Sequence, residues 1–480
     1  MTKEFKISVK TEYLLLVVAL LIFLFNQLPF LVDIRSVKYD EAWYMNPAYN
    51  LLNGNGLVNT LVGSGGNANF IVPMLMAGSM AVFGQSLLAA RLTAVLGGLI
   101  AVFVLHLILN EINANKRARI LTYAIFLSVT IINSTFRNVR PEFAAGLFML
   151  IGILFTIRYI RTHSWCDIIG LSVSIYLSSC SHPYALYLFA LIGCTLLFKI
   201  IQQKEWKRLS HMVLLVAAAL LVIISLMYAN KIFNHSSDAT VFINRLTITS
   251  IYEAISTYLK MMFVRHGIYT IPFLLLNIFA LIKYKEIRWL TISTILFVVT
   301  FPLIFSSDLH MLGNSIIYFS LLSIVLCAYL ANSFFDAPMV NCKRRKIIFG
   351  LLCLYCLGNQ AISMMYNYYR YEKCNSILAK EISGIVPENK LIFGSMRFWP
   401  FLMNAEWFCE MNRKQNVPNK FEYIILSSQD VSERDELNPK IVKDVINKIE
   451  EYDIVYMRAT KQYGLITIYK CKDTNHEHSI

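Results

Sequence analysis

The sequence has little charge and no cysteine framework. Only 15% of its 480 residues are Asp, Glu, Lys or Arg, whereas soluble domains carry about 25%. Cys353 and Cys356 form a C-x-x-C, but they lie inside an apolar run, and no second C-x-x-C completes a zinc site. No internal repeat or low-complexity tract appears. These absences exclude a soluble globular protein, a disulfide scaffold and a zinc module.

Long apolar runs are abundant instead, since 56% of the residues are hydrophobic. Runs such as 13–25 and 92–109 are long enough for hydrocarbon about 30 Å thick, where helices or closed barrels satisfy the backbone. They do not alternate with period two, so a barrel is disfavoured. We predict a mainly α, polytopic membrane bundle of about eleven transmembrane helices, at 13–32, 86–109, 119–135, 142–160, 167–181, 183–201, 210–230, 264–282, 289–305, 312–331 and 347–365.

The net charge of +14 comes from short basic clusters between these runs, which is a topology signal and not a nucleic-acid footprint. With an inner N-terminus, most clusters fall on the inner side if 69–83 does not cross the membrane. We therefore predict that 69–83, with Pro73, is an interfacial helix on the outer surface. The first span follows Lys3, Lys6 and Lys10 and has no small-residue cleavage site, so it is predicted to remain uncleaved.

The composition changes after residue 365. Charges rise, and strand patterns appear at 390–394, 422–428, 453–459 and 464–470, with a helical pattern at 439–452. The last two strands are predicted to form a hairpin. We predict two domains, a transmembrane domain at 1–365 and a small α/β domain at 366–480. With an inner N-terminus, eleven spans place the second domain on the outer, extracytoplasmic side of the membrane.

Two acids, Asp40 and Glu41, stand side by side just after the first span. Adjacent carboxylates near a low dielectric repel one another and are desolvated, which raises at least one pKa toward a value useful in a base. A solvated loop that carries acids by chance is the alternative.

A second polar cluster, Arg137, Arg140 and Glu142, follows the third span at the same predicted interface. The planar guanidinium of arginine can bind two phosphate oxygens at once, which favours a phosphate site. Alternatively, the arginines extend to the membrane interface for solvation, and Glu142 interacts with the dipole at the start of its helix. Arg91 lies inside the second span, where a charge is a functional candidate by default. His182, His266 and His310 also lie at outer ends of spans, where a structural hydrogen-bonding role is the more common one.

The order of these motifs resembles that of the superfamily C glycosyltransferases. The residues concerned are Asp40-Glu41-Ala42-Trp43-Tyr44, the interfacial helix ending at Phe83-Gly84, Ser86 to Leu92, and Arg140-Pro141-Glu142. The resemblance is closest to the protein O-mannosyltransferase-like branch, which includes aminoarabinose transferases acting on lipid A. It covers residues 13–200 well and the rest by architecture alone.

The resemblance implies a sugar donor on polyprenyl phosphate, transfer at the outer face, and a lipid, glycan or protein acceptor. It matches Asp40 to the catalytic acid and Glu142 to the second acid; Glu41 is a further catalytic candidate. Arg140, Arg137 and Arg91 are candidates for the donor phosphate, and Tyr44, Asn69, His182 and His310 for other substrate contacts. A divalent metal between Asp40 and Glu142 stays open. Relatives often carry a Lys or His before the interfacial proline, whereas residues 66–73 contain no cation.

Three rival functions remain. A transporter or flippase of lipid-linked sugars would be expected to show internal repeats with paired broken helices. A polysaccharide polymerase or ligase would carry more arginines in its outer loops, and a receptor would embed less of its chain. We therefore predict a glycosyltransferase in a bacterial inner membrane, with membrane lipids as partners and without nucleic acid.

Overall fold

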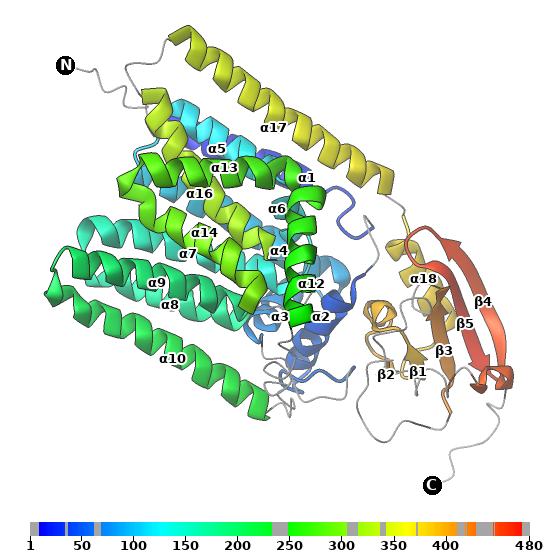
Figure 1. Ribbon diagram of the computed structural model, residues 1–480. Coiled ribbons are helices and arrows are strands. Elements are labelled where there is room, and N and C mark those ends of the chain that lie inside the picture. Colours follow the sequence, from blue (N-terminus) through cyan, green and yellow to red (C-terminus); the bar gives the residue numbers. More distant parts are fainter. Residues whose placement is uncertain are drawn as a thin grey trace. The chain divides into compact units, whose positions relative to one another are not determined.

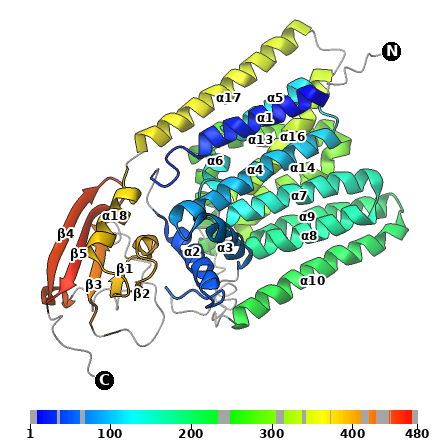
Figure 2. The same ribbon diagram turned by 180° about the vertical axis from the view of Figure 1, so that it is seen from behind.

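The computed structural model describes residues 9–33, 37–61, 69–232, 248–304, 315–336, 342–370, 373–409, 418, 420–428, 445 and 447–472. The fold is mainly helical and ends in a small domain built around a β-sheet (Figures 1 and 2). The predicted fold class, a helical membrane bundle with a small C-terminal α/β domain, is thereby confirmed.

The chain divides into two compact units. Unit 1 comprises residues 1–29, 94–227 and 236–365, and unit 2 comprises 30–93, 228–235 and 366–480. The association of residues 30–93 with the C-terminal region does not follow from the sequence pattern. The domain boundary after residue 365 stays a prediction.

Helices lie at each of the eleven predicted spans, but the count of eleven crossings is not confirmed. By length and composition, eight helices of the described residues are suited to cross a membrane, and a ninth span is possible if one bent pair is counted. The helices over these regions are α1 (Val9–Gln27), α4 (Leu87–Glu111), α5 (Lys116–Ser128), α6 (Thr130–Thr135), α7 (Pro141–Thr162), α8 (Trp165–Ser181), α9 (Tyr184–Gln202), α10 (Leu209–Ile232), α13 (Gly267–Lys283), α14 (Arg288–Ile304), α16 (Ile316–Asp336) and α17 (Cys342–Arg370).

The predicted helix 119–135 is broken, because α5 and α6 are separated by the extended residue Val129. Asn133 compensates for the break: its side-chain amide donates to the Leu127 carbonyl at 2.6 Å and accepts from Gln27 at 3.0 Å. This satisfies a carbonyl that the helix no longer uses. A second irregularity is a 104° bend between Tyr252–Arg265 and α13. The segment before the bend consists of most of α12 (Ile248–Leu259) and all of η2 (Lys260–Arg265).

One end of the helix bundle in unit 1 gathers the basic clusters. There Arg119 pairs with Glu12 at 3.2 Å, and Arg161 pairs with Glu111 at 2.9 Å. These pairs join the beginnings of α1 and α5 and the ends of α4 and α7. The gathering agrees with the positive-inside pattern, although the orientation in the membrane stays a prediction. The opposite end holds the end of α8 and the beginnings of α7, α9 and α16.

Unit 2 is built from α2 (Tyr39–Leu52), α3 (Ile71–Phe83), the start of α4, α18 (Asn375–Ile385) and a five-stranded sheet. The strand order is β2-β1-β3-β5-β4, with β1 (Leu391–Gly394), β2 (Glu406–Phe408), β3 (Tyr423–Ser427), β4 (Tyr452–Thr460) and β5 (Gly464–Cys471). β1 runs parallel to β2 and β3, and β5 runs antiparallel to β3 and β4. The predicted hairpin is therefore present, whereas most of the predicted helix 439–452 lies outside the described residues.

Candidate functional site

The two adjacent acids lie in the first turn of α2 but occupy different environments. Glu41 is fully buried, and Asp40 is half-buried. The Glu41 carboxylate binds the Arg91 guanidinium at two points, 2.9 Å from Nε and 2.8 Å from Nη2. It also accepts the backbone N–H of Lys38 at 3.0 Å, which closes the N-terminal turn of α2.

Arg91 holds the chain before α2 as well as the helix itself. Its Nη1 donates to the carbonyls of Leu31 and Val32, at 2.9 and 2.7 Å. The guanidinium is only 1% exposed and therefore depends on these partners. This geometry favours a positioning role for Arg91 and Glu41, while phosphate binding and catalysis by these residues stay predictions.

Tyr44 and Asn69 also belong to unit 2 and lie in contact. The Asn69 side-chain amide donates to the Tyr44 hydroxyl at 2.9 Å, which joins the chain just before α3 to α2. The buried Asn46 side chain adds a third anchor by accepting the Thr60 N–H at 2.8 Å. The helix that carries Asp40 is thus held at several points along its length.

Unit 1 brings together the second predicted cluster at the beginning of α7. Arg140 is the N-cap residue and Pro141 the first helical residue. Arg140 Nη2 lies 3.3 Å from Glu142 Oε1, and the Arg140 side chain is 26% exposed against 4% for Glu142. Among the described residues, neither oxygen of Glu142 accepts a hydrogen bond. Glu142 thus keeps acceptor capacity beside an accessible guanidinium.

Arg137 differs from Arg140 in its partners. Its side chain is buried and donates to the carbonyls of Asn26 and Pro29 at the end of the first span. Arg140 is consequently the better placed of the two for an external anion. The assignment of both arginines to a donor phosphate stays a prediction.

Two of the predicted histidines have tyrosine partners in unit 1. His182 follows α8, is buried, and its Nδ1 lies 3.1 Å from the Tyr318 hydroxyl. The Nδ1 of His266 lies 2.6 Å from the hydroxyl of Tyr269 at the helix bend. Ser178 joins α8 to Ala145 of α7 at 2.8 Å, so His182 and Glu142 share one end of this helix pair. His310 lies outside the described residues.

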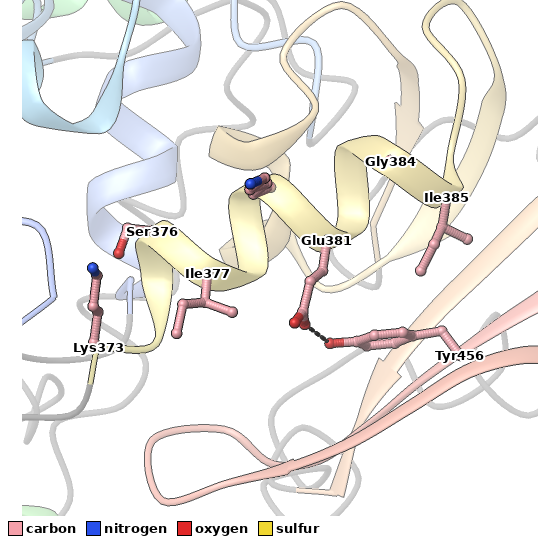
Figure 3. A pocket seen from close by; sticks show the side chains of 8 residues that line it. Lys373, Ser376, Ile377, Glu381, Gly384, Ile385 and Tyr456 are labelled. Carbon is pink, nitrogen blue, oxygen red and sulfur yellow. Dashed lines mark hydrogen bonds between the residues drawn. The ribbon is translucent and has the colours of Figure 1, made fainter.

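A shallow groove of about 850 Å³ runs along α18 in the C-terminal part of unit 2. Figure 3 shows Glu381 directed from α18 toward the hydroxyl of Tyr456 on β4, with which it is hydrogen-bonded. Arg458 binds the same carboxylate. The hydrogen bond from Tyr456, followed by the hydrogen bond from Arg458, lowers the pKa of Glu381. The groove residues were not predicted from sequence.

The predicted site residues therefore form two groups. Asp40, Glu41, Arg91, Tyr44 and Asn69 lie in unit 2, and Arg137, Arg140, Glu142 and His182 lie in unit 1. The convergence of the two groups at one site stays a prediction. Within the ranges that the structure describes, no three His, Cys, Asp or Glu side chains gather as metal ligands; a metal between Asp40 and Glu142 also stays a prediction.

Tyr463 and Asn375 contact the chain just before α2, the helix that carries Asp40, and the sequence analysis does not identify them. Tyr463 lies in the turn between β4 and β5, and Asn375 begins α18. The Tyr463 hydroxyl accepts the N–H of Val37, two residues before α2. No local sequence signal marks this contact, because 426 positions separate the two residues.

These features define a polytopic membrane protein whose partly exposed acid and arginine groups lie at helix beginnings. Residues 68–228 match the family model of the dolichyl-phosphate-mannose-protein mannosyltransferases. No curated protein matches the chain at a significant level.

The fold is similar to that of ArnT from Cupriavidus metallidurans in two crystal structures. With ArnT bound to undecaprenyl phosphate, the TM-score is 0.64 at 11% identity, over 97% of this chain and 99% of that one. With apo ArnT the TM-score is 0.65 at 12% identity, over 95% and 97%. The resemblance predicted from the motifs, to the mannosyltransferase-like and aminoarabinose transferase-like branch of the superfamily C glycosyltransferases, is thereby confirmed.

Proposed function

We propose that this protein transfers a sugar from a polyprenyl-phosphate carrier to a lipid, glycan or protein acceptor at the outer face of the membrane. The match of residues 68–228 to the mannosyltransferase family model carries the proposal. The fold shared with ArnT, which was crystallised with undecaprenyl phosphate, supports a donor of this chemical class. The basic clusters at one end of unit 1 support an outer position for Arg140 and Glu142.

Asp40 is the proposed base. The acceptor hydroxyl or amine attacks the anomeric carbon of the sugar, and its proton passes to the Asp40 carboxylate. The bond between the anomeric carbon and the phosphate oxygen breaks, and polyprenyl phosphate leaves with the bonding electron pair. Asp40 suits this role because it is half-buried in the first turn of a helix that the Glu41–Arg91 pair holds in place.

Arg140 is the proposed contact for the leaving phosphate. A guanidinium stabilises the negative charge that develops on the phosphate as the sugar departs. Arg140 is a quarter exposed, whereas Arg137 and Arg91 are buried and donate to backbone carbonyls. We assign Arg137 and Arg91 a positioning role and propose that Glu142 orients the Arg140 guanidinium.

Two measurements test this function. Mass spectrometry of the lipid that co-purifies with the protein should find a polyprenyl phosphate or its glycosylated form. Purified protein should then release polyprenyl phosphate from undecaprenyl-phosphate-linked sugars extracted from bacterial membranes. If the protein instead moves the intact glycolipid across vesicle membranes without cleaving it, the transporter reading replaces the transferase.

A further inference from the structure

The turn between β4 and β5 places one tyrosine hydroxyl against the chain that enters α2. Tyr463 is fully buried, and its ring lies 5.2 Å from that of Phe398, measured between centroids. Its hydroxyl accepts the backbone N–H of Val37 at 2.8 Å and donates to Asn375 Oδ1 at 2.8 Å. Because Val37 immediately precedes the N-cap residue of α2, the hydroxyl fixes the entry to the helix that carries Asp40.

The same contacts continue into a closed circuit of buried hydrogen bonds. Asn375 Nδ2 donates to the carbonyl of Val32 at 2.6 Å, and Arg91 Nη1 donates to the same carbonyl at 2.7 Å. Arg91 binds Glu41, and Glu41 accepts the N–H of Lys38, the neighbour of Val37. The chain of hydrogen bonds thus starts at Val37, passes through Tyr463, Asn375, the Val32 carbonyl, Arg91 and Glu41, and ends at Lys38, the residue next to Val37.

Because these groups are buried, the loss of one hydrogen bond leaves a donor or an acceptor without a partner and costs free energy. Desolvation raises the pKa of Tyr463, so its hydroxyl stays protonated and continues to donate to Asn375. Removing the hydroxyl leaves a buried N–H on Val37 and a buried oxygen on Asn375 without this partner. Unpaired groups of that kind favour a shift of the backbone toward other partners or water. The segment nearest to such a shift is the first turn of α2.

We propose that Tyr463 is a positioning residue for Asp40. The C-terminal hairpin then affects the rate of the reaction by fixing the start of α2, and it does not contact the substrate. This inference rests on the proposed function. The hairpin contributes a second bond to the same segment, from Gln462 Nε2 to the carbonyl of Asp33 at 2.9 Å. Ser376 of α18 adds two bonds to the Asp33 carboxylate, at 2.8 and 2.7 Å. The C-terminal part of unit 2 therefore sets the geometry of the entry to α2.

The decisive comparison is between Tyr463→Phe and the matched variant Tyr452→Phe. Tyr452 lies in the same sheet, and its buried hydroxyl also accepts a backbone N–H, from Phe421 at 3.1 Å. Tyr463→Phe should lower kcat about 10-fold or more, since small misplacements of catalytic groups have effects of this size. The donor KM should stay within about twofold, because the proposed phosphate contact lies on α7. Tyr452→Phe should leave both constants unchanged.

Hydrogen–deuterium exchange provides a readout that does not depend on activity. Amides in residues 37–46 should exchange faster in Tyr463→Phe than in wild type or Tyr452→Phe. If the wild-type protein transfers no sugar while this difference is present, the proposed function fails but the anchoring of α2 stands. If both variants match wild type in exchange and in kcat, or if KM and kcat change together, the positioning role is wrong. Should Tyr463→Phe fail to fold, Gln462→Ala replaces it, and an unchanged kcat in that variant overturns the proposal.

Discussion

The carboxylate of Glu41 binds the guanidinium of Arg91 at two points, although 50 positions separate the residues in the sequence. Both side chains are almost completely buried. Successive residues of a helix point in directions about 100° apart, so the neighbouring Asp40 does not share this direction. Two adjacent acids of similar chemistry thus have different roles, one in holding the helix and one in the proposed reaction.

Replacing Arg91 tests the structural role of this pair. Arg91→Met should destabilise the protein by about 3–5 kcal/mol, because it leaves a buried carboxylate without its partner. The double variant Glu41→Leu/Arg91→Met should recover part of this stability, since it removes the buried unpaired charge, whereas the Leu31 and Val32 carbonyls and the Lys38 N–H still lose a hydrogen bond. Melting temperatures in detergent measure both effects. An Arg91→Met protein that melts like wild type would contradict the role.

Asp40→Asn tests the proposed base. The amide keeps the size of the side chain but does not accept the proton, so transfer should fall by at least about 100-fold. Melting temperature and extraction from the membrane should remain close to wild type. Asp453→Asn is a suitable control because Asp453 is an exposed acid of the same unit, whose carboxylate lies 3.9 Å from the Lys472 ammonium. Full transfer activity in Asp40→Asn would remove Asp40 from the mechanism.

Arg140→Ala tests the proposed phosphate contact. Hydrogen bonds to charged groups contribute about 1.5–3 kcal/mol, so the affinity for the polyprenyl-phosphate donor should fall about 10- to 100-fold. Arg158→Ala is the matched control, since Arg158 lies near the other end of α7 and pairs with Asp167 at 3.1 Å. Binding of the donor to the purified protein measures the effect. Equal affinities in the two variants would count against the role of Arg140.

The sequence predicts those parts of the structure that depend on local patterns. Apolar runs mark the helices of unit 1, and alternation with a turn at residues 461–464 marks the β4–β5 hairpin. The break at Val129 is not predictable in this way, because the local sequence Ser128-Val129-Thr130 contains neither a proline nor a glycine that would mark the end of a helix. It depends instead on Asn133 and Gln27, which satisfy the polar groups around it.

In the candidate site, too, contacts between residues distant in the sequence are not predictable from local patterns. The motif around Asp40 and the arginines near Glu142 are visible in the sequence, because their residue types suggest the chemistry. The partner of Glu41 is not visible, and neither is the bond between Val37 and Tyr463. Such contacts join distant parts of the chain through burial and geometry, which periodicity does not record. The sequence therefore predicts which residues carry the proposed reaction better than it predicts which residues hold them.

The ion pair between Glu381 and Arg458 leads to a prediction about pH. Hydrogen bonding from Tyr456 and then from Arg458 lowers the pKa of Glu381 in the folded protein. Burial and the nearby Glu381 raise the pKa of Tyr456 to about 12, so that its hydroxyl continues to donate at neutral pH. A lowered carboxyl pKa stabilises the fold at pH above the unfolded value, and this contribution is lost as the pH falls through the folded value.

Glu381→Gln should therefore lower the stability of the protein near neutral pH and have progressively less effect in acid. The pair is partly exposed, so the loss at about pH 7 should be below about 1 kcal/mol. Melting temperatures of wild type and Glu381→Gln, measured from about pH 7 to about pH 3, should approach one another as the carboxyl takes up its proton. Glu406→Gln, at an exposed position of β2 in the same sheet, should show no such convergence. A constant difference between wild type and Glu381→Gln over this range would show that ionisation of Glu381 does not stabilise the domain.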